Sequence, residues 1–468
     1  MRIKNIYISL IVLLVCVTSV LAISVSNCAD LQGIGSTTGT CSDNYELITS
    51  FSCTGSFTPL CSAGYSGTFD GQGNNITGLS INLLSTDYIG MFKKLNTGGK
   101  IKNVRLINAD ITGRNYVGSL AGWMYASSLI DNSSVAGKVN GTSDVGGLAG
   151  TIQNSPINNS YFSGKVTGQG DDVGGLVGYA GDWNGWAMIY NCHATGTITG
   201  SSNVGGLLGY TYYSVMIKNS YSSGIVTGNG NNVGGLAGNM NGISSAIYNS
   251  FSTAKVNGID AVGGLAGHMD DHATVTNSYA AGAVTGRYSI GGLAGDVQTW
   301  ITSIINSYAI GKVTGKNYVG GLVGYLYYSS VYSSFATGTV ISTGGNSAGG
   351  LIGGSGNIYG TQVTNSYWHD NVGDNATTCY YAGWSCSGHP GGEDISYFQG
   401  DVNQSSGPFN QWTFGGSPWY KWIGPADYPH LDPQPESGIP EMGNSSVIAL
   451  VAIVAIAAII GVVLFKKK

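Results

Sequence analysis

Carboxylates are the first side chains in this sequence whose type and spacing could carry chemistry. Asp144, Asp171 and Asp172 stand beside runs of glycine, and Asp182 follows the second of these runs. Polysaccharide lyases and hydrolases need clustered carboxylates to transfer protons or to bind Ca²⁺. Asp144 and Asp172 share one position before a repeated valine, where later copies have Asn, Ala, Ser and Tyr. This variation favours a ladder of polar turn residues over a catalytic site.

The six histidines give a weaker signal for chemistry. His268 and His272 have the spacing that lets two histidines hold a metal on a helix. They fall between two β-type segments, so we expect both in a solvated loop. The sequence has no His-Glu-x-x-His motif of a zinc peptidase, and no Ser-His-Asp or Cys-His set can be argued. The sequence therefore predicts no catalytic residue, no metal and no cofactor.

An aromatic column is the strongest candidate for ligand binding. In one repeated position, rings occur together with Arg105, Ser134 and His193, so we expect an outward or half-exposed position. The rings in this column are Tyr161, Tyr221, Phe251, Tyr279, Tyr308, Phe335 and Tyr367. The predicted ligand contacts are Tyr161, Tyr221, Tyr279 and Tyr308. They would stack on sugar rings or touch partner proteins, and the alternative is that they stack on each other and stabilise the fold.

Further aromatic residues follow the glycine runs and extend the aromatic surface along another edge. These residues are Trp183, Trp186, Tyr212, Tyr213, Tyr327 and Tyr328. We weigh the same two interpretations for them, ligand contact or mutual packing.

The element that must position these side chains is a repeat with a step of 28 to 31 residues. The run Val145-Gly146-Gly147-Leu148-Ala149-Gly150 recurs with starts at Val173, Val204, Val233, Val262, Ile290, Val319 and Ala348. Each copy holds three short β-type segments, and none has the length and period of a helix. This pattern predicts an all-β, right-handed parallel β-helix of about ten rungs. A β-propeller is the competitor, but its blades need about 40 residues and four strands.

Two further columns predict which side chains face the interior. The residue before each aromatic is small, as at Ser160, Cys192 and Ser220, so it is expected to point inward. Cys192 is accordingly interpreted as a buried, unreactive thiol. The asparagine just before it, as at Asn191, is expected at a bend, where an amide tolerates left-handed backbone and stacks on its copies.

At this point the sequence resembles a known family. Gly-Leu-apolar-Gly cores followed by Asn-Ser-Tyr-Ala and Thr-Gly-x-Val-Thr-Gly resemble GLUG-motif repeats, over about residues 65–431. The lead-in from Tyr65 to Leu79 and the exit at Asn365-Ser366-Tyr367-Trp368 resemble the flanking segments of such proteins. The family occurs in bacterial and archaeal surface proteins, including adhesin-like ones and some immunoglobulin-cleaving metallopeptidases. The resemblance implies architecture and location rather than activity.

Composition excludes several classes of protein. Of 468 residues, 76 are Gly and 9% are charged, against roughly 7% and 25% in an average soluble protein. Such a low charge content excludes a disordered chain, and only 10 Pro without a regular Gly at every third position exclude collagen. The glycines disfavour long helices, and a net charge of −5 offers no basic surface for nucleic acid.

Both ends of the chain are predicted to be membrane-targeting segments. Residues 1–22 have a basic start and an apolar core, typical of a cleaved signal peptide, with a retained anchor helix as the alternative. Val447–Phe465 carries no charge and as a helix would span about 28 Å, enough to cross a bilayer. Lysines 466–468 place that end in the cytoplasm. The residues before this segment, Ile439 to Gly443, resemble the C-terminal anchors of archaeal surface proteins.

The cysteines agree with an exported chain. The disulfide candidates are Cys28, Cys41, Cys53, Cys61, Cys379 and Cys386. Four of them precede the repeats and are expected to form two disulfides, whose pairing the sequence leaves open. The last two are expected to form one disulfide. Sequons that would permit N-glycosylation lie at Asn75, Asn132, Asn140, Asn158, Asn375, Asn403 and Asn444.

These features predict the organisation of the chain. Residues 1–22 form the signal peptide, 23–64 a disulfide-rich N-terminal cap, 65–368 the GLUG-repeat β-helix, 369–433 a C-terminal cap, 434–446 a linker, 447–465 a transmembrane helix and 466–468 a cytoplasmic basic tail. The predicted function is non-catalytic, adhesin-like display of the β-helix at the cell surface, with glycans or envelope proteins as partners. The alternatives are an extracellular polysaccharide lyase or hydrolase with its site on one face of the coil, and a structural subunit of the cell envelope.

Overall fold

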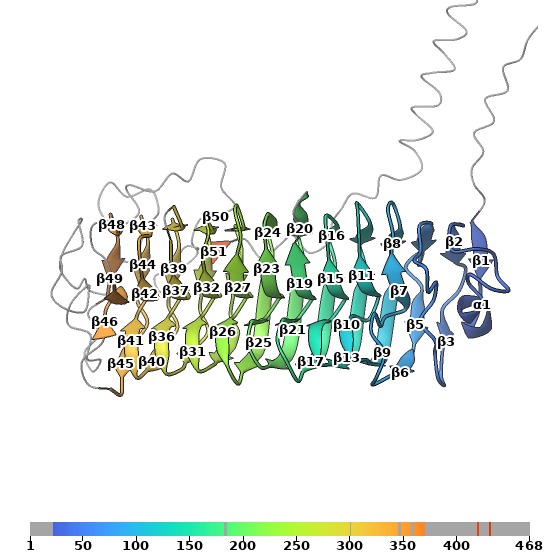
Figure 1. Ribbon diagram of the computed structural model, residues 1–468, viewed down its shortest axis with the longest axis horizontal. Coiled ribbons are helices and arrows are strands. Elements are labelled where there is room, and N and C mark those ends of the chain that lie inside the picture. Colours follow the sequence, from blue (N-terminus) through green and yellow to red (C-terminus); the bar gives the residue numbers. More distant parts are fainter. Residues whose placement is uncertain are drawn as a thin grey trace, which may run out of the picture. The chain divides into compact units, whose positions relative to one another are not determined.

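The computed structural model describes residues 22–181, 185–299, 301–344, 348–356 and 360–369, and the backbone of 419–420 and 430–431. The chain divides into two compact units. The second contains β50 (Trp419–Tyr420) and β51 (His430–Leu431), which pair in antiparallel fashion. The first unit is an all-β, right-handed parallel β-helix of about 11 turns, one more than the repeat count predicts. Figure 1 shows its strands stacked turn upon turn.

Each full turn from Lys100 onward passes through four parallel sheets, which we number in chain order. Sheet 1 contains β1 (Ile23–Val25), β2 (Tyr45–Leu47), β4 (Thr68–Asp70), β8 (Lys100–Lys102), β12 (Leu129–Asp131), β16 (Pro156–Asn158), β20 (Ala187–Tyr190), β24 (Val215–Lys218), β28 (Ala246–Tyr248), β33 (Thr274–Thr276), β38 (Ser303–Ile305), β43 (Ser330–Tyr332) and β48 (Gln362–Thr364). Sheet 2 contains β3 (Phe51–Ser52), β5 (Asn75–Thr77), β6 (Ser80–Asn82), β9 (Arg105–Thr112), β13 (Ser134–Gly141), β17 (Tyr161–Gly168), β21 (His193–Gly200), β25 (Tyr221–Gly228), β29 (Phe251–Ser252), β30 (Lys255–Asn257), β34 (Tyr279–Ala280), β35 (Val284–Thr285), β39 (Tyr308–Ala309), β40 (Val313–Gly315), β44 (Phe335–Ala336), β45 (Val340–Ser342) and β49 (Tyr367–Trp368).

The other two sheets hold the glycine-rich runs. Sheet 3 contains β10 (Asn115–Val117), β14 (Ser143–Gly146), β18 (Val173–Gly174), β22 (Val204–Gly205), β26 (Asn231–Gly234), β31 (Asp260–Gly263), β36 (Tyr288–Gly291), β41 (Asn317–Gly320) and β46 (Ala348–Gly349). Sheet 4 contains β7 (Phe92–Leu95), β11 (Ala121–Met124), β15 (Ala149–Ile152), β19 (Val177–Gly181), β23 (Leu208–Tyr212), β27 (Ala237–Asn241), β32 (Ala266–Met269), β37 (Ala294–Val297), β42 (Val323–Leu326) and β47 (Ile352–Ser355).

The prediction of three β-type segments per turn is wrong, because two of those segments bend and divide between sheets. The run that begins at Val262 supplies β31 to sheet 3 and β32 to sheet 4, with Gly264 and Leu265 at the corner. A Cβ at Gly264 would collide with the carbonyl oxygen of Gly292 and lie 2.8 Å from the Cβ of Ala280. The corner therefore requires glycine, since it approaches both the next turn and sheet 2.

The core is a narrow column of aliphatic side chains inside the coil. In one turn, Val262, Leu265, Ala266, Val275 and Val284 are all fully buried. Equivalent residues in neighbouring turns pair in register, as Val262 does with Val233 and with Ile290. Stacking identical positions about 4.8 Å apart also explains the scarcity of charge, since like charges would repel at that spacing.

The N-terminal segment closes the coil with a short helix and two disulfides. Helix α1 (Cys28–Gln32) begins at Asn27, whose side chain accepts hydrogen bonds from the backbone of Ala29 and Asp30. Two bonds join Cys28 to Cys53 and Cys41 to Cys61. Strands β1 and β2 already belong to sheet 1, so the coil begins inside the segment predicted as a separate cap.

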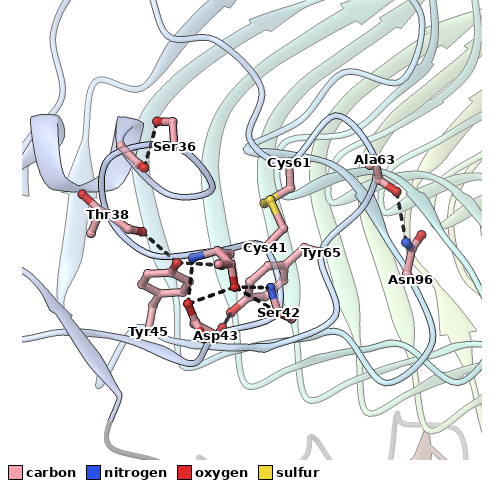
Figure 2. The surroundings of a disulfide bond; sticks show 12 residues. Ser36, Thr38, Cys41, Ser42, Asp43, Tyr45, Cys61, Ala63, Tyr65 and Asn96 are labelled. Atoms are coloured by element: carbon pink, nitrogen blue, oxygen red, sulfur yellow. Dashed lines mark hydrogen bonds between the residues drawn. A yellow bond between two sulfur atoms is a disulfide. The ribbon is translucent and has the colours of Figure 1, made fainter.

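Hydrogen bonds around the second disulfide fix the loop it closes. Figure 2 shows the Tyr45 hydroxyl donating to the carbonyl oxygen of Thr38, at 2.8 Å. Tyr65 donates to the carbonyl of Asp43 at 3.0 Å. Two buried tyrosines thus hydrogen-bond to backbone carbonyls of this loop.

Several predicted segments lie outside the described residues. They are residues 1–21 of the signal peptide, Cys379 and Cys386, nearly all of the predicted C-terminal cap, the linker, the spanning segment Val447–Phe465 and the basic tail. Within the part of the chain that the structure describes, no helix is both long and apolar enough to cross a membrane.

Candidate functional site

Asparagines in a left-handed conformation build the bend between sheets 1 and 2. The members are Asn103, Asn132, Asn159, Asn191, Asn219, Asn249, Asn277, Asn306 and Asn365, with φ between 45° and 56°. The amide of Asn277 donates to the side-chain oxygen of Asn249 at 3.2 Å, and Asn306 donates to Asn277 at 3.3 Å. The predicted asparagine ladder is confirmed.

A buried serine column follows directly and fixes the register of the turns. The hydroxyl of Ser250 accepts a hydrogen bond from the backbone of Ser220 at 3.1 Å and donates to the carbonyl of Tyr248 at 2.8 Å. Cys192 takes one serine's place, and its thiol donates to the carbonyl of Tyr190 at 3.3 Å. Burial raises the pKa of this thiol to about 12. The prediction of a small, buried cysteine is confirmed, and its low reactivity stays a prediction.

These two columns place the aromatic column at the start of sheet 2, where the rings stack on one another. The ring centroids of Phe251 lie 5.0 Å from Tyr221 and 4.9 Å from Tyr279, with planes inclined by 4° and 2°. Tyr308 continues the stack onto Tyr279 at 4.9 Å. Mutual stacking, the structural alternative named above, is therefore what this column does. Rings inside the stack have both faces covered, whereas Tyr161 at its end stacks on one ring, that of His193.

Exposure along this aromatic ladder falls toward the C-terminus. Tyr161 is 41% exposed, Tyr221 and Tyr279 are half-buried, and Tyr308 is 1% exposed. Burial raises the pKa of Tyr279 to about 12. The expected half-exposed position does not hold at Tyr308, which is buried. Of the four predicted contacts, Tyr161 presents the most surface.

A second left-handed column holds the predicted carboxylates. Tyr88, Tyr116, Asp144, Asp172 and Asn203 occupy equivalent positions in successive turns, with φ between 52° and 62°. The amide of Asn203 donates to Asp172 at 2.7 Å. Asn232, Ala261, Ser289 and Tyr318 continue the column, also at positive φ. The predicted polar turn ladder is thus present, and its first two members are aromatic.

An outward column on sheet 4 runs beside this bend. Paired strands align Lys94, Trp123, Thr151, Tyr179, Tyr210, Asn239, His268, Asp296 and Tyr325. A glycine directly precedes each of these residues except Lys94, which follows Lys93. A Cβ at one of these glycines, Gly178, would collide with the backbone of Asp144 and Val145. The last glycine of the repeated run is therefore needed because the bend of the preceding turn packs against it. We call these two adjoining columns the mixed face.

An aromatic patch lies at the N-terminal end of the mixed face, and sequence reasoning missed it. Tyr88 stacks on Tyr116 at 4.7 Å with planes inclined by 6°, and on Trp123 at 5.7 Å. Tyr125, 46% exposed, lies 5.8 Å from Trp123. The ammonium of Lys94 sits 4.2 Å above the Tyr88 ring and 4.8 Å above the Trp123 ring. The repeat alignment of Tyr88 and Tyr116 with Asp144 was the available signal.

Two carboxyl groups beside this patch, those of Asp144 and Asp172, have raised pKa values. Burial, with the charge of Asp172 nearby, raises the pKa of Asp144 to about 7. Burial also raises the pKa of Asp172 to about 6, although the hydrogen bond from Asn203 opposes this. Asp171 is exposed, its Oδ1 accepts from the backbone of Ser202 at 3.0 Å, and Asp182 lies outside the described residues.

His268 is not in a loop, which corrects the prediction. It lies in β32, and its side chain belongs to the outward column of sheet 4. Its ring nitrogens lie 3.9 Å from Asp270 and 3.6 Å from Asp296. Burial alone would lower its pKa, but the two carboxylates outweigh burial and raise it to about 9. His272 follows the strand and does not join this group.

The remaining predicted aromatic residues divide between packing and exposure. Tyr212 lies edge-on against Tyr213 at 4.4 Å, and Tyr327 against Tyr328 at 4.5 Å. Trp186 directly precedes β20 of sheet 1 and is 55% exposed. Trp183 lies outside the described residues.

Two sequence comparisons find known proteins that are similar to parts of this chain. The family model for the GLUG motif matches residues 170–199 and 315–341. Halomucin from Haloquadratum walsbyi is 35% identical in an alignment 113 residues long, which covers 21% of this chain and 1% of that protein. This chain thus spans a very small part of that relative's length.

A solved structure from Bacteroides ovatus is provisionally named an immunoglobulin A1 protease. Its match covers 72% of this chain and 85% of the chain in that structure. The identity is 17% and the TM-score is 0.35. The predicted resemblance to GLUG repeats is confirmed by the family model, and this chain carries the GLUG motif at residues 170–199 and 315–341.

Proposed function

We propose that this chain is a non-catalytic, adhesin-like protein displayed at the cell surface, where its β-helix binds glycans or other surface proteins. Its GLUG motifs and its match to Halomucin support a surface location. The two disulfides support an oxidising compartment outside the cytoplasm. The charge-free segment Val447–Phe465 would anchor the chain in the membrane in a single pass.

The aromatic patch on the mixed face is the observation that carries the binding role. Tyr116, Trp123 and Tyr125 present ring surface to solvent, and the rigid coil fixes their spacing. A flat ring offers an apolar surface that matches the C–H face of a sugar, while a tyrosine hydroxyl can hydrogen-bond at the edge. Aromatic residues are also the ones enriched where proteins bind each other. Lys94 adds a cation, which favours an acidic glycan.

A glycan array probed with the full chain tests this role. Trp123→Ala is expected to lower retention at least tenfold, because it removes the central ring while the outward position keeps the core intact. Tyr248→Ala is the matched control, since Tyr248 is 40% exposed on sheet 1, away from the patch. Equal retention by Trp123→Ala and the original chain would contradict this assignment of the binding surface.

A glycan-degrading enzyme is the second candidate, and the pair Asp144 and Asp172 favours it. The valines that follow them pair in adjacent strands, which lie about 4.8 Å apart. Glycoside hydrolysis uses one protonated and one ionised carboxyl group near each other. Raised pKa values of about 7 and about 6 make such a mixed state accessible near neutral pH. Appearance of new reducing ends in an added polysaccharide, lost in Asp144→Asn, would support this candidate.

A further inference from the structure

We propose that sheet 1 carries a binding groove for an anionic amphiphile, a molecule with one aliphatic chain and a carboxylate or phosphate head group. The groove lies on a different sheet from the mixed face, so the inference does not rest on the proposed function. It concerns a cavity of about 470 Å³ on the outer surface of the coil.

The floor of the groove is a single column of outward side chains. Lys100, Leu129, Pro156, Met188 and Met216 occupy one position in successive strands of sheet 1. Each strand lies about 4.8 Å from the next, so the column runs about 19 Å along the coil. Four of the five residues are apolar, and all four are only half-buried.

The apolar character of this column stops where the groove stops. The same position in the following strands holds Ala246, Thr274, Ser303, Ser330 and Gln362. Small and polar residues are what a solvent-facing sheet position ordinarily carries. A stretch of leucine, proline and two methionines confined to the cavity therefore indicates an apolar occupant, and methionine adapts readily to flexible chains.

Trp186 forms the wall of the groove. It is 55% exposed and lines the cavity together with Ser127 and Asn154. Gly185, just before it, lies so close to Asn154 that a Cβ there would collide with the amide. Glycine at this position lets the tryptophan approach the floor, and the ring provides a large apolar surface facing the column.

Lys100 supplies the charge that selects the head group. Among the nine residues that line the cavity, it is the charged one. Its neighbour Lys102 pairs with Asp70 at 2.8 Å, whereas no carboxylate among the described residues pairs with Lys100. An anionic head at Lys100 with its chain along Leu129, Pro156 and Met188 would satisfy both the charge and the apolar floor. A glycan is disfavoured, because Ser127 and Asn154 are the uncharged polar side chains available there.

Photo-crosslinking of the full chain tests the groove. A diazirine derivative of dodecanoic acid is bound and activated, and the modified peptides are located by mass spectrometry. We expect saturable labelling of peptides that contain Leu129, Met188 or Met216. Competition by dodecanoate and by dodecyl phosphate distinguishes the two head groups, and dodecanol tests the need for charge. Labelling confined to residues 447–465, or displacement by an oligosaccharide but not by dodecanoate, would overturn the proposal.

Variants make the test specific for the groove. Met188→Asp places a negative charge on the floor and is expected to lower labelling of these peptides at least tenfold. Ser303→Asp is the matched control, because it makes the same change to an outward residue of the same column beyond the cavity. Met188→Leu should keep labelling unchanged, which separates lost binding from misfolding. Lys100→Met is expected to weaken dodecanoate competition about two- to fivefold and leave dodecanol unaffected. Equal labelling of Met188→Asp and Ser303→Asp would contradict the proposal.

Discussion

The phenol ring of Tyr161 lies flat on the imidazole ring of His193, with centroids 4.7 Å apart and planes inclined by 6°. His193 stacks in the same way on Tyr221. Burial in this stack lowers the pKa of His193, because a charged imidazole would be desolvated between two rings. The aromatic column is thus a structural ladder whose exposed end is Tyr161. Substitutions inside the ladder and at this end therefore separate a role in stability from a role at the surface.

The ladder should contribute most to stability in its interior. Phe251 stacks on two rings, so Phe251→Ala is expected to lower the free energy of unfolding by about 2 kcal/mol. Tyr161→Ala removes one stacked pair at an exposed end and should cost about 1 kcal/mol. Urea unfolding followed by tryptophan fluorescence measures both, with Phe251→Tyr as the conservative control. A larger loss for Tyr161→Ala than for Phe251→Ala would contradict the stacking account.

The asparagine ladder combines backbone geometry with amide bonding, and two variants separate the two effects. Asn249 has φ 48° and hydrogen-bonds to the amides of Asn219 and Asn277. Asn249→Gly loses the bonds and keeps the left-handed backbone without strain. Asn249→Ala loses the bonds and adds a steric cost, so it should be less stable than Asn249→Gly by about 1 kcal/mol. Equal free energies of unfolding for the two variants would show that backbone strain plays no part.

Stability should depend on pH through Asp144 and Asp172. In the folded chain the pKa values of both carboxyl groups, about 7 and about 6, lie above the ordinary value of 3.8 for an aspartic acid. Between about pH 4 and pH 7 the folded chain therefore binds more protons than the unfolded chain, and its stability falls as the pH rises. Asp144→Asn removes one of these groups and should flatten this slope in urea titrations at pH 4, 5, 6 and 7. The same slope in the variant would mean that Asp144 ionises in the folded state as freely as in water.

The N-terminal disulfides should stabilise the start of the coil. Their loops span 25 and 20 residues, and closing a loop of that size contributes about 3 kcal/mol by restricting the unfolded chain. The double variant Cys28→Ser with Cys53→Ser is expected to expose the amides of β1 and β2 to hydrogen exchange. Amides of β36, many turns away, serve as the internal control, because repeat proteins couple mainly to their neighbours. Unchanged exchange in β1 and β2 would rule out a role for this bond in closing the coil.

The local chemistry of each turn could be predicted from the sequence. Asn277 and its copies revealed the left-handed bend because asparagine tolerates that conformation, and Cys192 revealed the inward column because it replaces serine. The pairing of Cys28 with Cys53 could not be predicted, since four cysteines allow three pairings. The division of each turn among four sheets was also not predicted. The corner at Gly264 divides a run whose sequence looks like a single strand.

The surfaces were harder to predict than the coil. Tyr308 and Tyr161 occupy one column, yet only the first is buried, and a repeat pattern carries no information on what packs over each turn. The aromatic patch joins Tyr88 and Tyr116 of the second left-handed column to Trp123 of sheet 4, and the two columns touch because Gly122 precedes Trp123 and packs against the backbone of Tyr88. The groove on sheet 1 arises where Met188 and Leu129 replace polar residues at one position, which becomes visible only once the strands are aligned.

Non-catalytic glycan binding by the β-helix is tested most directly by incubating the full chain with a panel of polysaccharides and measuring retention and cleavage together. The expected result is retention of at least one polysaccharide, at least tenfold weaker in Trp123→Ala, with no new reducing or unsaturated ends. Asp144→Asn and Asp172→Asn should retain the same polysaccharide without producing such ends. Release of new chain ends by the original chain, lost in Asp144→Asn, would contradict the account and establish a glycan-degrading enzyme.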